Sequence, residues 1–297
     1  METIIDFGPI QFVQGEKGGR YPFCNSIFIP GAGVLIDPSS HRETLLELKP
    51  RITSIWLSHW HEDHIMHLDL FDDLPLSLHE QDEPPLKNID TFVDWYGLDR
   101  ERDRPLIEHW KKMLVELFHF SPRSANSYLN GEDSIDLDGL RVDIIHVPGH
   151  SPGHLAFFFP EIEILFTGDY DLTPFGPWYG DRYSSIDDII ASVNRLKQIP
   201  AKICLTGHEE GVFHRVDEAG WNRYLSVIDQ REEVLYELLK EPKTLAEIGD
   251  AWIVYGKPIK PVEEFNMIEQ ISMKKHADRL IKQGLIAFDG DVYYRMQ

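Results

Sequence analysis

The sequence is short of cysteine, of positive charge and of long apolar segments. Its 297 residues include two cysteines, Cys24 and Cys204, which excludes a disulfide framework and a cysteine-rich metal site. No apolar run reaches the length of a membrane-spanning helix, and Met1–Phe12 carries acidic residues but no basic segment. We therefore expect no signal peptide, no association with membranes and a cytoplasmic location.

Acidic side chains greatly outnumber basic ones. The 50 Asp and Glu residues against 29 Lys and Arg residues give a formal net charge of −21. A surface of this charge repels phosphate backbones and anionic membranes unless one face is locally basic. The balance disfavours nucleic acid as a partner and favours a small-molecule substrate.

The segment Ser58–His64 has the highest density of metal-ligating side chains. It reads S-H-W-H-E-D-H and follows an apolar, β-branched run, R-I-T-S-I-W-L, that is typical of a buried strand. His59 and His61 are two residues apart, so an extended backbone points both side chains the same way. A turn after them allows Asp63 and His64 to face a second point close by.

Three later segments present further ligands after strand-like runs. His150 lies in V-P-G-H-S-P-G-H, Asp169 in L-F-T-G-D and His208 in C-L-T-G-H-E. Each of these ligands has a glycine beside it. Imidazole and carboxylate together suit Zn²⁺ or a similar borderline metal. Four strand ends with seven ligands provide enough donors for two metal ions.

These motifs resemble those of the metallo-β-lactamase superfamily over about the first three-quarters of the chain. The resemblance implies an α/β fold, an αββα sandwich with the metals at one edge of two facing sheets. It implies a first metal held by His59, His61 and His150, a second held by Asp63, His64 and His208, and Asp169 as the bridge between them.

Two more residues are expected to support the ligands. Asp37 ends the strand-like run G-V-L-I-D and matches an aspartate that supports the ligands in this superfamily. His154 lies outside the ligand set, and we expect it to orient a ligand or the substrate. The sequence departs from the family at residues 65–67, where I-M-H stands in place of two frequent glycines. This departure concerns the shape of the pocket floor and leaves the metal ligands intact.

The remaining pattern predicts two further parts of the chain. We expect Ile4–Val13 and Ser26–Ile29 as the first strands of a catalytic domain over residues 1–220, with a helical insertion at about 80–128. From residue 221 the β pattern gives way to helices at Arg223–Leu239, Thr244–Trp252 and Met267–Gln283, followed by a hairpin with an Asp-Gly turn. This small C-terminal domain, 221–297, resembles a winged-helix unit.

The C-terminal domain has a modest positive charge at its end. Lys274, Lys275, Arg279 and Lys282 are the side chains that would face a phosphate chain. DNA-binding modules usually carry a stronger basic surface. We therefore favour packing against the catalytic domain, closure of the pocket or a homodimer contact over binding of nucleic acid.

The segment after Asp169, P-F-G-P-W-Y-G-D-R-Y, is rich in turn formers and aromatic residues. Trp178, Tyr179 and Tyr183 are candidates to contact the substrate, because the segment leaves the metal edge and a tyrosine hydroxyl there would polarise a carbonyl. Anchoring of the loop is an equally good interpretation of these three side chains.

The sequence thus predicts a dinuclear metal-dependent hydrolase. Two divalent ions lower the pKa of a shared water and hold the hydroxide against an electrophile, and Asp63 would orient it. The pattern H-x-H-x-D-H favours zinc, although iron and manganese suit the same ligands. A thioester, ester or lactone is the favoured substrate, by similarity to hydroxyacylglutathione hydrolases. Two alternatives stay open: a single-strand RNA nuclease or phosphodiesterase of the same superfamily, and a metal-binding sensor or partner protein without turnover.

Overall fold

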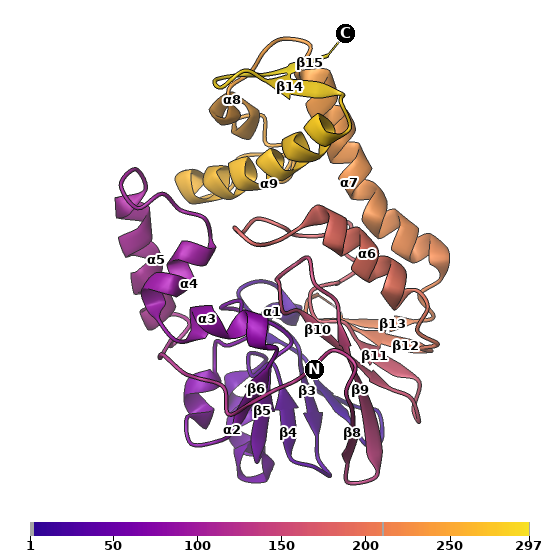
Figure 1. Ribbon diagram of the computed structural model, residues 1–297. Helices are drawn as coiled ribbons and strands as arrows, with labels where there is room; N and C mark the ends of the chain where they lie inside the picture. The colour runs from indigo at the N-terminus through magenta and orange to yellow at the C-terminus, as the bar shows by residue number, and fades with distance from the viewer. Residues whose placement is uncertain (1–2, 210, 297) are drawn as a thin grey trace.

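The computed structural model describes residues 3–209 and 211–296, which form two facing β-sheets flanked by helices, with the C-terminal elements above them (Figure 1). Within these ranges the first sheet has seven strands in the order β1 (Ile4–Asp6), β2 (Gln11–Val13), β3 (Ser26–Ile29), β4 (Val34–Ile36), β5 (Ser54–Trp56), β6 (Leu76–Leu78) and β7 (Ser127–Tyr128). The second has six in the order β13 (Val212–His214), β12 (Ile203–Leu205), β11 (Ile164–Phe166), β10 (Leu155–Phe159), β9 (Leu140–His146) and β8 (Ser134–Leu137).

The direction of the central strands determines where their ends lie. In the first sheet β4 and β5 are parallel, and in the second sheet β11 and β12 are parallel. Parallel strands have their carboxyl ends at the same edge of a sheet, which is where open α/β sheets bind ligands. The chain segments that follow these four strands therefore gather at one edge of the sandwich.

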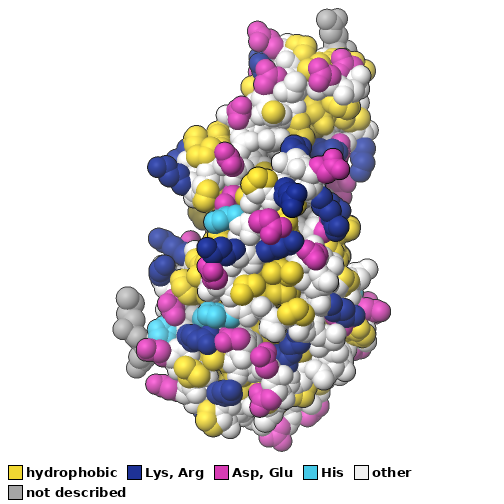
Figure 2. All heavy atoms as spheres, turned by 90° about the vertical axis from the view of Figure 1, so that its left-hand side faces the viewer, with side chains coloured by type: hydrophobic (Ala, Val, Ile, Leu, Met, Phe, Trp, Pro, Cys, Tyr) yellow, Lys and Arg dark blue, Asp and Glu magenta, His cyan; other side chains and the backbone are white. Residues whose placement is uncertain are grey.

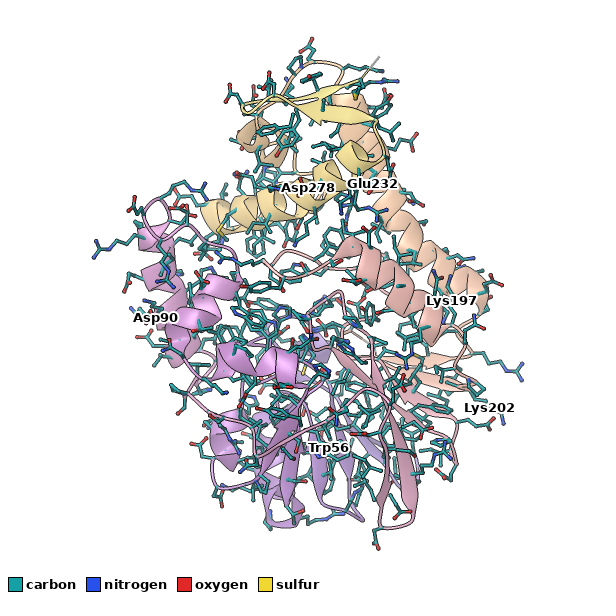
Figure 3. The ribbon with its side chains drawn as sticks, in the orientation of Figure 1. Trp56, Asp90, Lys197, Lys202, Glu232 and Asp278 are labelled. Carbon is teal, nitrogen blue, oxygen red and sulfur yellow. The ribbon has the colours of Figure 1, made fainter. Side chains whose placement is uncertain are left out.

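Side chains alternate between a core shared by the two sheets and a core behind each sheet. In β3, Ile27 belongs to the shared core and Phe28 to the outer core of the first sheet, whereas in β10 Phe157 is shared and Phe158 lies behind the second sheet. The rings of Trp56 and Phe157 stack across the shared core with centroids 5.9 Å apart (Figure 3 labels Trp56).

Helices cover the outer faces of both sheets. Those preceding residue 200 are α1 (Glu16–Gly19), α2 (Arg42–Leu48), α3 (Glu83–Leu86), α4 (Ile89–Trp95), α5 (Arg104–Glu116) and α6 (Ile186–Leu196), with 3₁₀ turns η1 (Lys49–Arg51), η2 (Leu68–Phe71) and η3 (Glu80–Asp82). Ser185 caps the N-terminus of α6, because its side chain accepts a hydrogen bond from the backbone N–H of Asp188. It buries Ile189 and Val193 behind the second sheet.

The insertion consists of α3, α4 and α5, between β6 and β7. Its aromatic side chains, including Trp110 and Phe118, are buried in the outer core of the first sheet. That core reaches the histidine motif, because the ring of Trp60 packs against Phe92 of α4 with centroids 4.9 Å apart. The insertion is thus continuous with the segment that carries His59 and His61.

The C-terminal elements are α7 (Glu218–Leu238), α8 (Leu245–Gly249), α9 (Val262–Lys282), β14 (Ile286–Phe288) and β15 (Tyr293–Arg295). α8 begins with a capping box formed by Thr244 and Glu247. The elements follow in the expected order and enclose a core of their own. α7 also contributes Tyr224 to the core behind the second sheet, so the predicted boundary at residue 221 falls inside a helix shared by both cores. The winged-helix resemblance stays a prediction.

None of the helices in the described part of the chain combines the length and apolar composition needed to cross a lipid bilayer.

Candidate metal centre

The seven predicted ligands lie together at the edge where the parallel strands end. His59, His61, Asp63 and His64 follow β5, His150 follows β9, Asp169 follows β11, and His208 follows β12. Their ligand atoms form three overlapping groups suited to a metal ion: His59, His61 and His150; His59, His64 and Asp169; and Asp63, His64 and His208.

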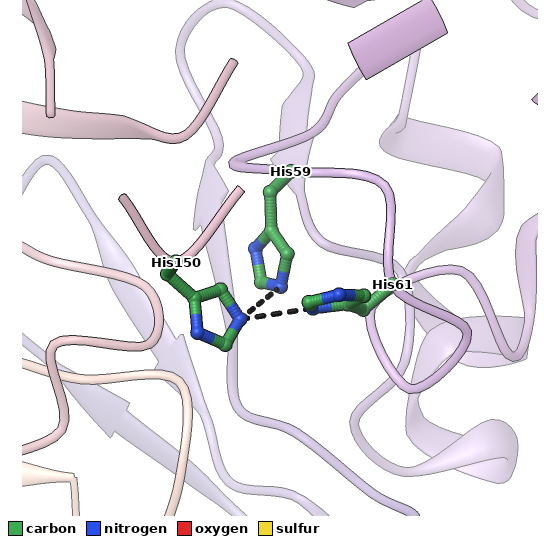
Figure 4. A group of neighbouring side chains, drawn as sticks. All are labelled: His59, His61 and His150. Atoms are coloured by element: carbon green, nitrogen blue, oxygen red, sulfur yellow. Dashed lines mark hydrogen bonds between the residues drawn. The ribbon is translucent and has the colours of Figure 1, made fainter. Parts of the chain in front are cut away.

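The first group is formed by His59, His61 and His150, whose rings converge in Figure 4. Nε2 of His150 lies 2.9 Å from Nδ1 of His61 and 3.2 Å from Nε2 of His59. In tetrahedral zinc sites with Zn–N bonds of about 2.0 Å, neighbouring nitrogens are about 3.3 Å apart. Burial lowers the pKa of His150 to about 4, so its ring is neutral and keeps a lone pair for a metal.

The second group is formed by Asp63, His64 and His208. Nε2 of His208 lies 3.2 Å from Oδ2 of Asp63 and 3.4 Å from Oδ2 of Asp169. Oδ1 of Asp169 lies 2.8 Å from Nε2 of His64, and its Oδ2 lies 3.3 Å from Nε2 of His150. The Asp169 carboxylate therefore faces both groups, as a bridging ligand must.

Two buried polar atoms at the centre lack a hydrogen-bond partner. Among the described residues, Nε2 of His64 and Oδ1 of Asp169 make no hydrogen bond, either with each other or with another group. A buried polar atom without a partner costs about 1–3 kcal/mol. A cation between the two atoms removes that cost, so the residues present fit a bound metal.

Each imidazole of the two groups has its outer ring nitrogen next to an oxygen acceptor. These contacts join His59 Nδ1 to Ser58 Oγ at 3.0 Å, His61 Nε2 to Asp181 Oδ2 at 3.1 Å, His64 Nδ1 to Asp37 Oδ2 at 2.9 Å, His150 Nδ1 to the Trp178 carbonyl at 3.2 Å, and His208 Nδ1 to the Gly19 carbonyl at 2.9 Å. In the neutral form of each ring, the outer nitrogen carries the proton and the inner nitrogen presents its lone pair to the centre.

Asp37 supports two of these imidazoles from the end of β4. Its Oδ2 accepts hydrogen bonds from Nδ1 of His64 and from Oγ of Ser58, and its Oδ1 accepts one from the backbone N–H of Ser58. The residue is completely buried and has a φ of 55°, a costly conformation for a side chain other than glycine. Asp37 thus lies where the family resemblance implied.

His154 contacts the backbone of the bridging aspartate. The N–H of Asp169 donates a hydrogen bond to Nε2 of His154 at 3.2 Å. Gly168 has a φ of +53°, and a Cβ at this position would lie 2.7 Å from the same nitrogen. Only glycine permits this close approach, which explains the glycine beside the ligand. His154 is therefore placed to orient a ligand, one of the two roles expected for it.

Asp181 is a supporting residue that the sequence reasoning missed. Its side chain is completely buried. It lies in residues 174–184, hereafter the 174–184 loop, which form part of the connection between β11 and α6. Its Oδ1 accepts hydrogen bonds from the backbone N–H groups of Tyr183 and Ser184, while its Oδ2 faces His61. The only signal in the sequence is an aspartate after the aromatic run P-W-Y-G, and no histidine motif accompanies it.

Asp82 is a second buried aspartate that was not predicted. Its carboxylate accepts hydrogen bonds from Oγ of Ser151 at 2.5 Å and from the backbone N–H of Gly153 at 2.6 Å. These contacts fix the turn that carries His150. Burial raises the pKa of Asp82 to about 7.

Glu62 connects the histidine motif to the insertion. This buried carboxylate accepts hydrogen bonds from the hydroxyl of Tyr21, at 2.8 Å, and from that of Tyr96 next to α4. Desolvation of the two hydroxyl groups and the nearby Glu62 carboxylate raise the pKa of both tyrosines well above the ordinary value, although the rest of the Tyr21 side chain is exposed. Both hydroxyls are therefore neutral donors that hold Glu62 in place.

The three aromatic candidates for substrate contact lie in different surroundings. The ring of Trp178 packs edge-on against His61, with centroids 5.2 Å apart. Tyr179 is completely buried and its hydroxyl faces the C-terminal helices. Tyr183 is 46% exposed and packs against Trp95. Trp178 therefore contacts a metal-ligand candidate, whereas Tyr179 anchors the loop to the C-terminal helices.

Comparison with known protein families identifies the chain. The model of the metallo-beta-lactamase superfamily matches residues 19–208, which is more than half of the sequence. The chain belongs to this superfamily, as the motifs indicated, and several of its relatives carry the names of hydrolases.

Several curated proteins match parts of the chain. An acyl-coenzyme A thioesterase of Gallus gallus is 28% identical over 176 residues, which cover 58% of each chain. A hydroxyacylglutathione hydrolase of Xylella fastidiosa is 34% identical over 108 residues, 35% of this chain and 40% of that protein. A probable metallo-hydrolase of Streptococcus pyogenes is 28% identical over 146 residues, 46% of this chain and 56% of that protein. Each match covers less than two thirds of the relative.

Solved structures share the fold over nearly the whole length. A metallo-beta-lactamase family protein from Thermus thermophilus superposes with a TM-score of 0.67 at 21% identity, covering 97% of this chain and 93% of that one. A beta-lactamase domain protein from Burkholderia ambifaria gives a TM-score of 0.70 at 14% identity, covering 99% and 93%. At these identities the likeness shows the fold alone, and it confirms the predicted fold class.

Proposed function

We propose that this chain is a dinuclear metal-dependent hydrolase that acts on a small-molecule thioester, ester or lactone. The observation that carries the proposal is the arrangement of five imidazoles at the metal centre, four of them buried and that of His208 partly buried, each with its outer nitrogen at an oxygen acceptor and its inner nitrogen towards the centre. Five imidazole nitrogens with free lone pairs and the carboxylates of Asp63 and Asp169 converge on the same site. Binding of cations is the simplest explanation for this arrangement of ligands.

The proposed ligands divide between the two groups described above. His59, His61 and His150 would hold the first metal, Asp63, His64 and His208 the second, and Asp169 both. We propose zinc for both positions, and iron and manganese suit the same donors. Two bound divalent ions supply a water of lowered pKa and polarise the oxygen of the scissile group.

The chain's own residues provide the remaining requirements. Asp63 orients the nucleophile through its carboxylate. Asp37 and Asp181 hold imidazole rings in their orientation by accepting hydrogen bonds from the outer ring nitrogens. No serine or cysteine nucleophile is required. Both cysteines are buried, and burial raises the pKa of Cys204 to about 12, so this thiol is unsuited to nucleophilic attack.

The substrate class is supported by the relatives and by the charge. Two of the matched relatives are named as an acyl-coenzyme A thioesterase and a hydroxyacylglutathione hydrolase. Basic and acidic side chains are interspersed on the face that Figure 2 shows. On α9, Lys274 pairs with Asp278, and Arg279 pairs with Glu232. These cations already have partners within the chain, which favours a small substrate over RNA.

The test combines metal content with a substrate panel. Protein prepared without chelators is analysed for metals and assayed on an acyl thioester, a lactone, a phosphodiester and single-stranded RNA, beside His59→Ala. We expect about two metals per chain and turnover of a thioester, ester or lactone that is lost in the variant. Fewer than one metal per chain, or full occupancy without turnover on the panel, contradicts the proposal, and the second result favours a metal-binding sensor.

A further inference from the structure

The 174–184 loop supplies oxygen acceptors to two of the three imidazoles of the first group. Asp181 accepts from Nε2 of His61, and the Trp178 carbonyl accepts from Nδ1 of His150. The described residues between β11 and α6 include no helix or strand that would fix these acceptors. Their positions therefore depend on what the loop packs against.

α7 holds the first half of the loop through one buried guanidinium. Arg231, which is 4% exposed, donates hydrogen bonds to the carbonyls of Phe175, at 2.7 Å, and Pro177, at 3.1 Å. It donates a third to the hydroxyl of Tyr179 at 2.6 Å, and it lies over the ring of Phe175. Its contacts thus lie on both sides of Trp178, whose carbonyl faces the metal centre.

α9 holds the same loop from a second direction. The Tyr179 hydroxyl donates to Nε2 of His276 at 2.7 Å, and Nδ1 of His276 contacts Oε1 of Glu232 at 3.3 Å; Figure 3 shows Glu232 on α7 beside α9. At the end of the loop, Nζ of Lys275 donates to the carbonyl of Ser184 at 2.6 Å. Three side chains of the C-terminal helices, Arg231, His276 and Lys275, thus hold the loop, in addition to its contacts with α4 through Arg182.

We propose that Arg231, Lys275 and His276 are positioning residues for the first metal, which they influence through the 174–184 loop. The proposal rests on the metal centre of the proposed function. An imidazole whose outer nitrogen loses its acceptor rotates more freely and binds a metal less tightly. The imidazoles of the second group take their acceptors from Asp37 and Gly19 instead, so the effect falls on one of the two metals.

The experiment uses two conservative variants and a matched control on the full-length protein. Tyr179→Phe removes the hydroxyl that joins Arg231 to His276, and Lys275→Met removes the ammonium group at nearly constant volume. Lys274→Met is the control, because Lys274 lies on α9 beside Lys275 but is exposed and pairs with Asp278. Each protein is loaded with Co²⁺ or Zn²⁺, titrated with a competing chelator and examined by visible absorption.

We expect both variants to bind one of the two metals about 3- to 10-fold more weakly, since changes to residues directly behind a ligand cost about 10- to 100-fold and these act one contact further away. The Co²⁺ absorption bands of that site should shift, the other metal should bind as in the wild type, and Lys274→Met should match the wild type.

Two results would overturn this inference. One is wild-type metal affinity and wild-type Co²⁺ bands in both folded variants. The other is equal weakening of both metals, which indicates general loosening of the structure. Circular dichroism identifies a variant that has not folded, and the other variant then decides. The readout is independent of substrate: a metal-loaded wild type without turnover refutes the proposed function and leaves this test intact.

Discussion

Asp181 accepts a hydrogen bond from Nε2 of His61 at 3.1 Å, although 120 residues separate the two in the sequence. The contact makes His61 face the first metal group through Nδ1, whereas His59 and His150 face it through Nε2. The tautomer of one candidate ligand is thus set by a loop that lies beyond all but one of the ligand motifs in the chain.

Asp181→Asn should weaken the binding of the first metal. Both carboxylate oxygens accept hydrogen bonds from N–H groups, so either orientation of an asparagine places its NH₂ group against another donor. We expect metal affinity to fall about 10- to 100-fold and hydrolysis to fall with it. Chelator competition measures the change. Asp188→Asn, on the exposed side of α6, should bind metal as the wild type does, and an unchanged affinity in Asp181→Asn would show that the contact does not position His61.

Replacement of single ligands should show which residues hold which metal, through the metal content of each variant. His59→Ala should reduce the content from about two metals per chain to about one, because we propose His59 as a ligand of the first metal alone. Asp169→Ala should lower the content further, because its carboxylate faces both groups. Activity should fall about 10³-fold or more in each, since several kcal/mol of transition-state stabilisation are lost. Two metals per chain in Asp169→Ala would be incompatible with a bridging role.

Removal of the metals should lower thermal stability. A ligand present at a thousand times its dissociation constant stabilises the native state by about 4 kcal/mol, and without it the carboxylates of Asp63 and Asp169 lose their counter-charge. We expect a chelator to lower the Tm by about 5 °C or more, and added zinc to restore it. In Asp169→Ala the chelator should have little effect. A wild-type Tm that is unchanged by the chelator would argue against bound metals.

Asp82 should make the metal-free protein less stable as the pH rises from 4 to 7. Burial raises its pKa from 3.8 to about 7. Over that range the unfolded chain has lost this proton and the folded chain keeps it, so the free energy of unfolding falls by about 1.4 kcal/mol per pH unit. Asp82→Asn removes this contribution, and the decrease between pH 5 and pH 7 should be smaller by about 2–3 kcal/mol.

Urea unfolding at both pH values, in the presence of chelator, measures the effect of Asp82. The control is Asp73→Asn, an exposed position before β6, which should retain the wild-type dependence on pH. Identical pH dependence in Asp82→Asn and the wild type would show that Asp82 is ionised in the folded protein at pH 5.

Adjacent positions on α5 should differ in their contribution to stability. Leu114 is completely buried in the outer core of the first sheet, whereas Val115 is 54% exposed. Leu114→Ala should lower the free energy of unfolding by about 3 kcal/mol, through lost burial and the cavity left behind. Val115→Ala should change it by about 0.5 kcal/mol or less. Equal effects would mean that the insertion does not pack as described.

The family and the fold class could be predicted because their signals are local. His59, His61, Asp63 and His64 stand in one short motif, and each later ligand has its own strand and glycine. Asp181 and Asp82 could not be predicted, because their partners come from loops that meet only in the folded chain. An isolated aspartate in a sequence carries no sign that it is buried.

Boundaries of elements were less predictable than their existence. Ile4–Val13 was expected as one strand and is instead two antiparallel strands, β1 and β2, because Gly8 has a φ of +80° and turns the chain. α7 and α9 begin before their predicted starts. Their first turns, E-A-G-W and V-E-E-F, mix acidic and apolar residues and give no clear apolar periodicity. At α7 the informative signal was Asp217, which caps the helix.

The distribution of the ligands along the chain has a consequence for the order of events in folding. The histidine motif after β5 is synthesised long before His208, and the first group lacks His150 until the second sheet has formed against the first. Contacts so distant in sequence form late, because the chain between them must first be ordered. A nascent chain therefore carries an incomplete set of metal ligands. It reaches its full metal affinity only after the two sheets have packed against each other.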